Sequence, residues 1–289
     1  MTPFDATVCA LGEGPLWHPE RGMLFWFDIL GKRLYAQSPE KEGQTRLEWR
    51  FDTHFSAAGW VDRDTLLLAS EAALWRFNID SGAKVAVCAL DADNPVTRSN
   101  DGRADPWGGF WIGSMGKETE PEAGAIYRYY RGELRQLKDK ITVSNAISFA
   151  PDKSCGYYTD TVTGQIMRQP LSAADGWPDG DPTVFADLKG QRLNPDGAVT
   201  DAEGNLWVAM WGAACVVCFA PDGTEICRID VPARQPTCPA FGGPLLRDLY
   251  LTSATTGLND SDMQKRPLNG QTFVLHDVAQ GVAEPRVLL

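Results

Sequence analysis

Apolar positions in this chain occur in short runs rather than at helical spacing. The runs are rich in aromatic and β-branched side chains, and Gly, Pro, Asp and Asn separate them along the whole length. This pattern is typical of strands joined by tight turns, whereas an amphipathic helix repeats its apolar positions about every 3.6 residues. The sequence therefore predicts a fold that is mostly β.

One arrangement recurs six times: an apolar segment, a turn, a second apolar segment rich in aromatic residues, a polar break and a third segment. The second segments are the clearest copies: Met23–Phe27, Thr65–Leu68, Gly109–Ile112, Gly156–Thr159, Asn205–Val208 and Asp248–Leu251. Their central residues are separated by 42, 44, 46, 50 and 42 positions. A period of about 40–50 residues with several strands per repeat is typical of propeller blades. We therefore expect an all-β, six-bladed β-propeller that forms a single domain over residues 1–289, with the loop Ser172–Pro182 inside one blade.

Composition and charge narrow the classes of partner. With 43% hydrophobic and 22% charged residues, the chain has the composition of a globular protein. A net charge of −11 repels phosphate backbones and anionic membrane surfaces, so nucleic acid and membranes are poor candidates as partners. No apolar stretch approaches 18 residues, and the first residues lack a secretion-signal pattern, so we expect a cytoplasmic location.

The seven cysteines are odd in number and scattered, which favours reduced thiols. Cys215 and Cys218 form a C-x-x-C pair, but no second pair stands at zinc-site spacing. On a strand, residues three apart face opposite sides. We therefore expect these two cysteines to be small buried residues and not metal ligands.

Four repeats carry an oxygen-bearing side chain at matching positions near the start of their first segment: Glu13, Asn100, Asn145 and Asp196. The innermost strand of each propeller blade lines the central channel, so these side chains are expected to converge at one axial site. Carboxylate and amide oxygens are suitable ligands for a divalent cation. Asn-Asp-Gly and Pro-Asp-Gly are also common turn sequences, so a turn is the alternative for each motif taken alone. Glu13 is a poor turn former and is costly to bury unpaired, which favours a shared cation site.

Four segments closely resemble motifs of the gluconolactonase, regucalcin and luciferin-regenerating-enzyme family, in the order of that family and over the whole chain. They are LGEGPLW at 11–17, SNDGRADPWGGFWIGSM at 99–115, SNAI at 144–147 and PDGAVTDAEGNLWVA at 195–209. The resemblance implies a six-bladed propeller with one divalent cation on its axis and, for many members, hydrolysis of sugar lactones. It implies that Glu13, Asn145 and Asp196 are the metal ligands.

The resemblance also implies that Arg98 and Asn100 contact the substrate. Glu118 stands where some relatives contact a sugar hydroxyl, although its charge-rich loop makes a solvated surface position an equal alternative. Asp196 is the implied catalytic residue, which accepts a proton from the attacking water while the cation polarises the lactone carbonyl. Arg98 would supply a fixed positive donor to the lactone oxygens, and its alternative is a structural ion pair with Asp101 or another acid.

Catalysis through a Ser or Cys nucleophile is not indicated, because no Gly-x-Ser-x-Gly elbow occurs and the three histidines show no partner pattern. We expect His18 and His276 to be structural or exposed. His54 precedes the second blade and is a candidate for the pocket.

The leading hypothesis is therefore a metal-dependent hydrolase that opens a sugar-acid lactone, with a small-molecule lactone as partner and a monomer or weak oligomer as its state. Two alternatives stay open: hydrolysis of other esters or phosphotriesters on the same propeller, and a non-catalytic calcium-binding propeller. Oxygen-only ligation suits Ca²⁺, Mg²⁺ or Mn²⁺, and Zn²⁺ and Fe²⁺ also accept such sites. The loops that decide which lactone is bound are not readable from the sequence.

Overall fold

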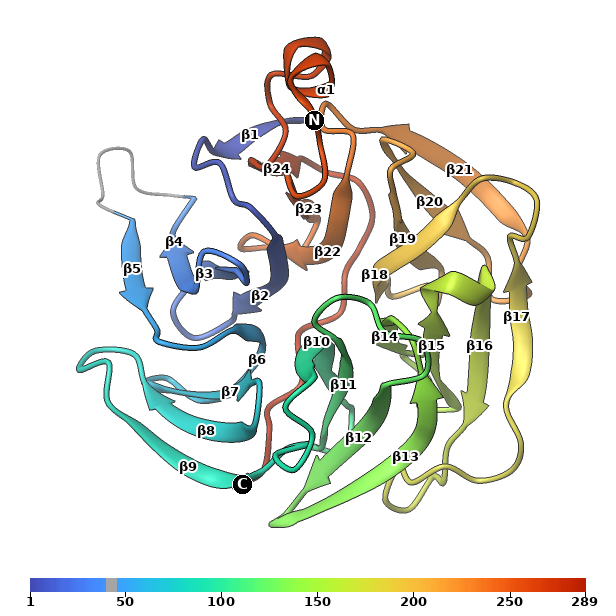
Figure 1. Ribbon diagram of the computed structural model, residues 1–289. Coiled ribbons are helices and arrows are strands. Elements are labelled where there is room, and N and C mark those ends of the chain that lie inside the picture. The colour runs from blue at the N-terminus through green and yellow to red at the C-terminus, as the bar shows by residue number, and fades with distance from the viewer. Residues whose placement is uncertain (40–45) are drawn as a thin grey trace.

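A computed structural model describes residues 1–39 and 46–289, and in this part of the chain six four-stranded antiparallel sheets surround a central axis (Figure 1). The predicted all-β, six-bladed propeller is confirmed. The helices of the described residues are the 3₁₀ turn η1 (Thr161–Thr163) and the short α1 (Asp260–Lys265). Neither is long and apolar enough to cross a membrane.

Each blade runs outward from an inner strand. Blade one contains β2 (Gly12–His18), β3 (Met23–Asp28), β4 (Arg33–Gln37) and β5 (Leu47–Arg50). Blade two contains β6 (Phe55–Asp62), β7 (Thr65–Ser70), β8 (Ala73–Asn78) and β9 (Lys84–Ala89). Blade three contains β10 (Thr97–Ala104), β11 (Phe110–Gly116), β12 (Gly124–Tyr130) and β13 (Glu133–Ile141).

The second half repeats the arrangement. Blade four contains β14 (Ser144–Phe149), β15 (Cys155–Asp160), β16 (Gln165–Pro170) and β17 (Thr183–Asp187). Blade five contains β18 (Asn194–Thr200), β19 (Leu206–Trp211), β20 (Cys215–Phe219) and β21 (Glu225–Asp230). Blade six contains β22 (Pro236–Gly242), β23 (Asp248–Ser253), β24 (Thr272–Leu275) and, as its outermost strand, β1 (Thr2–Asp5).

The two ends of the chain close the ring in blade six. β1 pairs antiparallel with β24, with Thr2 opposite Val274 and Pro3 opposite Phe273. Figure 1 shows the blue N-terminal strand beside the red β24. The sequence pattern does not predict this strand, because a four-residue segment with little apolar alternation gives a weak signal. The loop Ser172–Pro182 lies between β16 and β17 of blade four, inside one blade as expected.

Within residues 1–39 and 46–289 the hydrophobic core is divided into six clusters, one between each pair of neighbouring blades. The strands of each blade pack against one neighbouring blade on each face of the sheet. Alternate residues of one strand therefore belong to two different clusters. Cys215 packs in the cluster between blades four and five, and Cys218 packs in the cluster between blades five and six. The expectation that these cysteines face opposite sides is confirmed.

Every inner strand contains at least one extra residue relative to its neighbour. In blade one, Glu13 lies opposite Phe27 while Leu16 lies opposite Phe25, so three steps on β2 match two steps on β3. The same irregularity occurs in β6, β10, β14, β18 and β22. Such bulges reorient side chains at the rim of a sheet. The Asn-Asp-Gly and Pro-Asp-Gly motifs lie within these bulged strands, so the alternative that they form turns is wrong.

After β24 the chain crosses the far end of the channel. In Figure 1 this C-terminal segment passes from beside β22 behind β10 to its end near β9. Arg103 of β10 forms a buried ion pair with Glu284 of the segment and donates to Ala198 O at 3.0 Å. Val287 N donates to Trp60 O at 2.8 Å. The C-terminal segment therefore covers this end of the channel, and the opposite end holds the candidate site.

Candidate functional site

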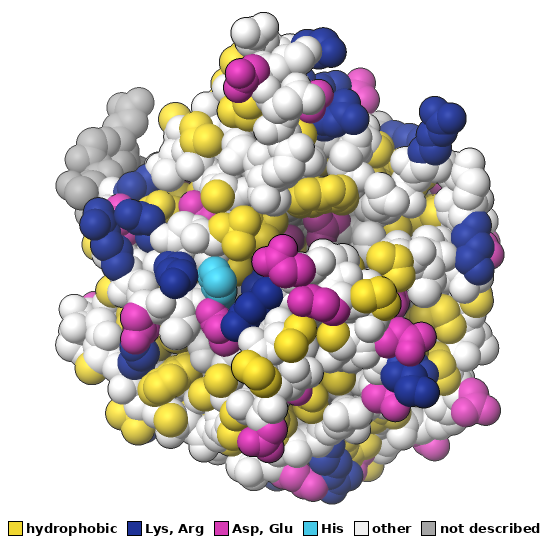
Figure 2. Space-filling view, in the orientation of Figure 1, with side chains coloured by type: hydrophobic (Ala, Val, Ile, Leu, Met, Phe, Trp, Pro, Cys, Tyr) yellow, Lys and Arg dark blue, Asp and Glu magenta, His cyan; other side chains and the backbone are white. Residues whose placement is uncertain are grey.

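A cavity of about 330 Å³ opens where the inner strands begin. It is lined by Leu11, Glu13, Leu30, Arg98, Asn100, Met115, Lys117, Thr119, Val143, Asn145, Thr161, Asp196, Trp211 and Thr256. Charged side chains of both signs gather beside hydrophobic ones near the centre of the face drawn in Figure 2. Five of the six predicted site residues line this cavity, and Glu118 does not.

Two carboxylates lie deeply buried at this cavity. Glu13 is 5% exposed and Asp196 is 4% exposed. Burial is the main cause that raises the pKa of Glu13 to about 8, and Gly14 N donates to Glu13 Oε2 at 3.0 Å. Burial, and next the negative charge of Glu13, raise the pKa of Asp196 well above its usual range. The two groups thus share one site and repel each other.

Two amide side chains connect the inner strands of blades three and four at this cavity. Asn100 Nδ2 donates to Asn145 Oδ1 at 3.0 Å and to Ser144 O at 2.9 Å. Asn145 Nδ2 donates to Thr161 Oγ1 at 2.9 Å. Because Thr161 accepts a hydrogen bond from the Asn145 amide nitrogen, the Asn145 amide oxygen lies on the side of Asn100 and the cavity.

Arg98 is the cation of this group. Its Nη1 donates to Asn100 Oδ1 at 2.8 Å and to Ser99 O at 2.9 Å. Burial lowers the pKa of Arg98 to about 10, while Glu13 and Asp196 favour its charge, so it remains positive near neutral pH. Asp101 instead accepts from Ile147 N at 2.7 Å, and no ion pair joins it to Arg98 in the described part of the chain. The alternative pairing with Asp101 is therefore wrong.

The donor set fits a divalent cation. Neither Glu13 nor Asp196 has an ion-pair partner among the described residues, although both are buried, and unpaired buried carboxylates are costly. In residues 1–39 and 46–289 no three His, Cys, Asp or Glu side chains form a metal-binding group. A site here would therefore combine two carboxylates with the Asn145 amide oxygen, which is a set suited to Ca²⁺, Mg²⁺ or Mn²⁺.

The four oxygen-bearing residues do not occupy equivalent strand positions, and this corrects the sequence expectation. Glu13 and Asn145 stand at the last paired position before the bulge, whereas Asn100 and Asp196 stand inside it. The residue after Glu13 is Gly14 with φ 53°, and the residue after Asn145 is Ala146 with φ 55°. These left-handed residues turn the strand locally, so the bulges bring side chains from unequal positions to one cavity.

The remaining candidates lie at the margin or outside. Glu118 is exposed, and its backbone N donates to Glu120 Oε2 at 3.0 Å, while its neighbours Lys117 and Thr119 line the cavity. His54 Nδ1 lies 2.7 Å from Glu71 Oε1, outside the cavity wall.

The other two histidines are structural or exposed, as expected. His18 is fully buried, with Nε2 at 3.2 Å from Asp62 O. His276 is 68% exposed and contacts Asp248.

Most residues of the cavity wall carry no motif that the sequence pattern singles out. Leu30, Lys117, Thr161 and Trp211 each lie at or just after the end of the second strand of their blade. Their common place after the second strand of a repeat could have predicted them. The loop after the second strand lies at the same end of the propeller as the start of the first strand.

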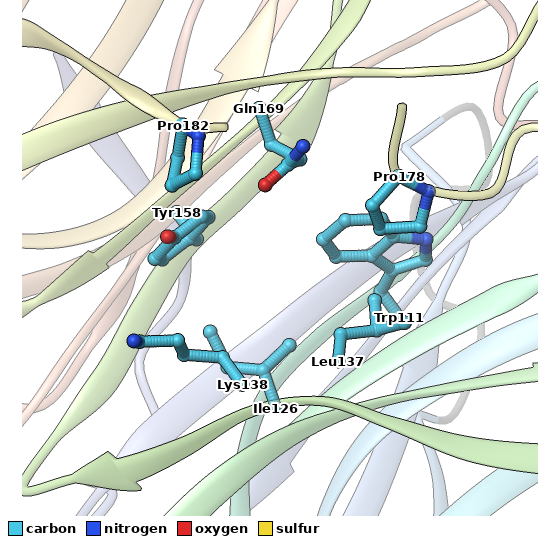
Figure 3. A pocket seen from close by; sticks show the side chains of 8 residues that line it. All are labelled: Trp111, Ile126, Leu137, Lys138, Tyr158, Gln169, Pro178 and Pro182. Atoms are coloured by element: carbon cyan, nitrogen blue, oxygen red, sulfur yellow. The ribbon is translucent and has the colours of Figure 1, made fainter. Parts of the chain in front are cut away.

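A second cavity of about 220 Å³ lies between blades three and four (Figure 3). Figure 3 shows Tyr158 and Lys138 on one side of it and Trp111 with Pro178 on the other. None of the described residues that line it carries a carboxylate. Its described lining therefore lacks the carboxylates that the axial cavity provides.

Comparisons with known proteins agree with this fold and show the family. Residues 11–255 match the family model described as SMP-30/gluconolactonase/LRE-like region. The L-arabinolactonase of Azospirillum brasilense is 32% identical over 96% of this chain and 91% of its own. The 6-deoxy-6-sulfogluconolactonase of Pseudomonas putida is 31% identical over 95% of this chain and 94% of its own.

Among solved structures, regucalcin from Agrobacterium tumefaciens, described as a calcium-binding protein, aligns with a TM-score of 0.97. It is 37% identical and covers 100% of this chain and 97% of its own. The chain therefore belongs to the SMP-30/gluconolactonase/LRE-like family, and the resemblance found in the sequence motifs is confirmed.

Proposed function

We propose that this family member hydrolyses sugar lactones with the help of one divalent cation bound by Glu13, Asn145 and Asp196. The activities named for its bacterial relatives support this substrate class, and the calcium-binding description of the regucalcin structure supports a divalent cation. The observation that carries the proposal is the pair of buried carboxylates, which form no ion pair among the described residues, beside the Asn145 amide in one open cavity. A cavity of about 330 Å³ is sufficient for a single sugar ring.

A bound cation supplies a Lewis acid that polarises the lactone carbonyl and stabilises negative charge on its oxygen. Its positive charge would also lower the raised pKa values of both carboxylates and keep them ionised at neutral pH. Glu13, Asn145 and Asp196 would hold it, because each presents an oxygen to the cavity. Asn100 supports this set by donating to Asn145 Oδ1.

The side chains of this site carry out the proton transfers and the orientation. Asp196 accepts a proton from a water molecule while the water oxygen bonds to the carbonyl carbon. The bond between the carbonyl carbon and the ring oxygen then breaks, and Asp196 returns the proton to the ring oxygen. The product is the open hydroxy acid, so atoms and charges balance without a redox partner.

Arg98 and Asn100 orient the lactone on this route. Asn100 Oδ1 holds the Arg98 guanidinium in place, and that guanidinium keeps further N–H donors for the lactone oxygens. Leu30, Met115 and Trp211 add apolar wall, against which the carbon face of a sugar ring can pack. Glu118 would contact a sugar hydroxyl only if its loop turned the side chain toward the cavity.

The test is a panel of aldonolactones assayed by acid release on metal-stripped protein reconstituted with Ca²⁺, Mg²⁺, Mn²⁺, Zn²⁺ or Fe²⁺. Spontaneous hydrolysis is subtracted, and a carboxylic ester and a phosphotriester are included as competing substrates. Cation-dependent opening of at least one lactone supports the proposal. Turnover of the ester or phosphotriester alone would contradict it, and cation binding without any turnover would indicate a non-catalytic propeller.

A further inference from the structure

Thr161 joins two of the proposed ligand segments. It is the first residue of η1, it lines the cavity, and its Oγ1 makes two hydrogen bonds. Oγ1 accepts from Asn145 Nδ2 at 2.9 Å and donates to Pro195 O at 2.8 Å. One hydroxyl therefore bridges the inner strand of blade four to the residue that precedes Asp196 in blade five.

This bridge determines which end of the Asn145 amide reaches the cation site. Only the amide oxygen can coordinate a cation, because the NH₂ group has no available lone pair. Thr161 Oγ1 binds the NH₂ group on one side, and Asn100 Nδ2 donates to the oxygen on the other side at 3.0 Å. The oxygen retains a second lone pair for a cation, and rotation of the amide would break both hydrogen bonds.

The backbone holds the hydroxyl in place. Thr161 N donates to Val143 O at 2.9 Å, and Gly164 N donates to Thr161 O at 3.1 Å. The turn ends at Gly164 with φ 64°, in the left-handed region that glycine favours. Backbone hydrogen bonds thus fix the position of Thr161.

We propose that Thr161 is a positioning residue that sets the cation affinity of the site by orienting the Asn145 amide and fixing the segment before Asp196. The inference rests on the proposed cation site and assigns Thr161 no contact with the reacting atoms. Hydrogen-bond partners behind metal ligands typically change metal affinity by about 10–100-fold.

The experiment compares Thr161→Val, which removes the hydroxyl at nearly constant shape, with Thr161→Ser, which retains it. Thr163→Val is the matched control, because Thr163 Oγ1 on the same turn donates to Asp160 O at 2.7 Å and accepts from Gln165 N at 3.2 Å. The Kd for Mn²⁺ and for Ca²⁺ is measured by calorimetry without any lactone, and Tm is measured for each variant. Thr161→Ala replaces Thr161→Val if the valine variant does not fold.

We expect Thr161→Val to weaken the Kd by at least about tenfold, and Thr161→Ser and Thr163→Val to leave it within about threefold of wild type. Unchanged affinity in Thr161→Val overturns the inference, as does an equal loss in Thr163→Val, which would indicate a general effect on the turn. A raised KM for a lactone with unchanged Kd would make Thr161 a substrate contact and also overturns it.

The readout separates this inference from the proposed function. Wild-type protein that binds the cation but opens no lactone contradicts the lactonase proposal, while the affinity ratios among the variants still decide the role of Thr161. Wild-type protein that binds neither Mn²⁺ nor Ca²⁺ overturns the inference. Active wild-type protein with unchanged affinity in Thr161→Val overturns the inference alone.

Discussion

At the scale of single residues, Asp196 is proposed both to bind the cation and to accept a proton from water, and a substitution can distinguish these two roles. Asp196→Asn preserves the shape and one candidate ligand oxygen, but it removes the negative charge and the proton acceptor. General-base catalysis typically contributes 10²–10⁴-fold, so we expect kcat to fall by at least about 10²-fold on cation-saturated protein. Steady-state kinetics on a lactone together with the measured cation content test this.

The matched control for that substitution is Asp230→Asn, on the exposed outer strand of the same blade. We expect its kcat to equal that of wild type. Near-normal turnover in cation-loaded Asp196→Asn would mean that another group activates the water. His54, which contacts Glu71 at the edge of the site, would be the next residue to test.

Glu13 shows a conflict between stability and function. Its pKa is about 8 in the folded, cation-free protein and about 4.5 in an unfolded chain, so the folded state binds its proton more tightly. The stability that this carboxyl contributes is present at low pH and is lost as pH rises from about 4.5 to about 8. A neutral residue at position 13 avoids this loss.

We therefore predict that Glu13→Gln raises the Tm of chelator-treated protein at pH 8.5 by a few degrees and has a smaller effect at pH 5, while it weakens cation binding. Thermal unfolding at both pH values is the measurement. Glu20→Gln, at an exposed position next to β2, serves as the control for net charge and should change Tm little at either pH. A Glu13→Gln protein that is less stable than wild type at pH 8.5 would contradict this account.

At the scale of elements, the alternation of β20 explains why its cysteines are not a metal pair. Cys215 and Cys218 are buried in two different interfaces between blades, and burial raises the pKa of both thiols, so they remain protonated. A metal-binding C-x-x-C needs both sulfurs on one side and deprotonated.

The corresponding prediction concerns the double variant Cys215→Ala/Cys218→Ala. Metal content and turnover should match wild type, and stability should fall by about 1–2 kcal/mol because small buried groups are removed from two clusters. Elemental analysis, lactone kinetics and denaturant unfolding measure the three quantities. Loss of the bound ion would show that the interpretation of this pair is wrong.

The bulges of the inner strands act at the same scale. They allow a Glu and an Asn before the bulge, and an Asn and an Asp inside it, to reach one cavity. Without the extra residue, neighbouring positions on a strand would point to opposite faces. The site is therefore a property of the bulged inner strands as a set and not of any one motif.

At the scale of the whole molecule, the C-terminal segment closes one end of the channel through Arg103 and Glu284. Arg103 is buried, and besides its ion pair it donates to Ala198 O at 3.0 Å and to Pro239 O at 3.3 Å, which joins blades three, five and six. Removing one partner of a buried ion pair leaves the other charge uncompensated, which typically costs about 3–5 kcal/mol.

We predict that Glu284→Gln lowers the free energy of unfolding by about 3 kcal/mol, toward the lower end of that range because the amide oxygen can still accept a hydrogen bond. Urea unfolding measures the loss, and Glu203→Gln on an exposed turn is the control. Because the ion pair lies at the opposite end of the channel from the cavity, cation affinity of the folded variant should stay unchanged. A large loss of affinity with intact stability would contradict this separation of the two ends.

Local sequence determined the number of blades, three of the four strands in each blade and the opposite facing of Cys215 and Cys218. It did so because strand alternation, turn residues and the spacing of repeats are properties of neighbouring positions. The motifs also identified Glu13, Arg98, Asn100, Asn145 and Asp196, which the fold brings to one cavity. These predictions needed no knowledge of how the sheets pack.

Only the tertiary structure decided the closure of the ring by β1, the plug formed by Arg103 and Glu284, and the place of Thr161 between Asn145 and Pro195. It also placed Glu118 on the surface and its neighbour Lys117 on the cavity wall. Each of these features depends on residues far apart in the chain, or on the direction in which a loop turns a side chain. Such relations are set by packing between blades and by hydrogen bonds across them, which no local pattern of apolar and polar positions encodes.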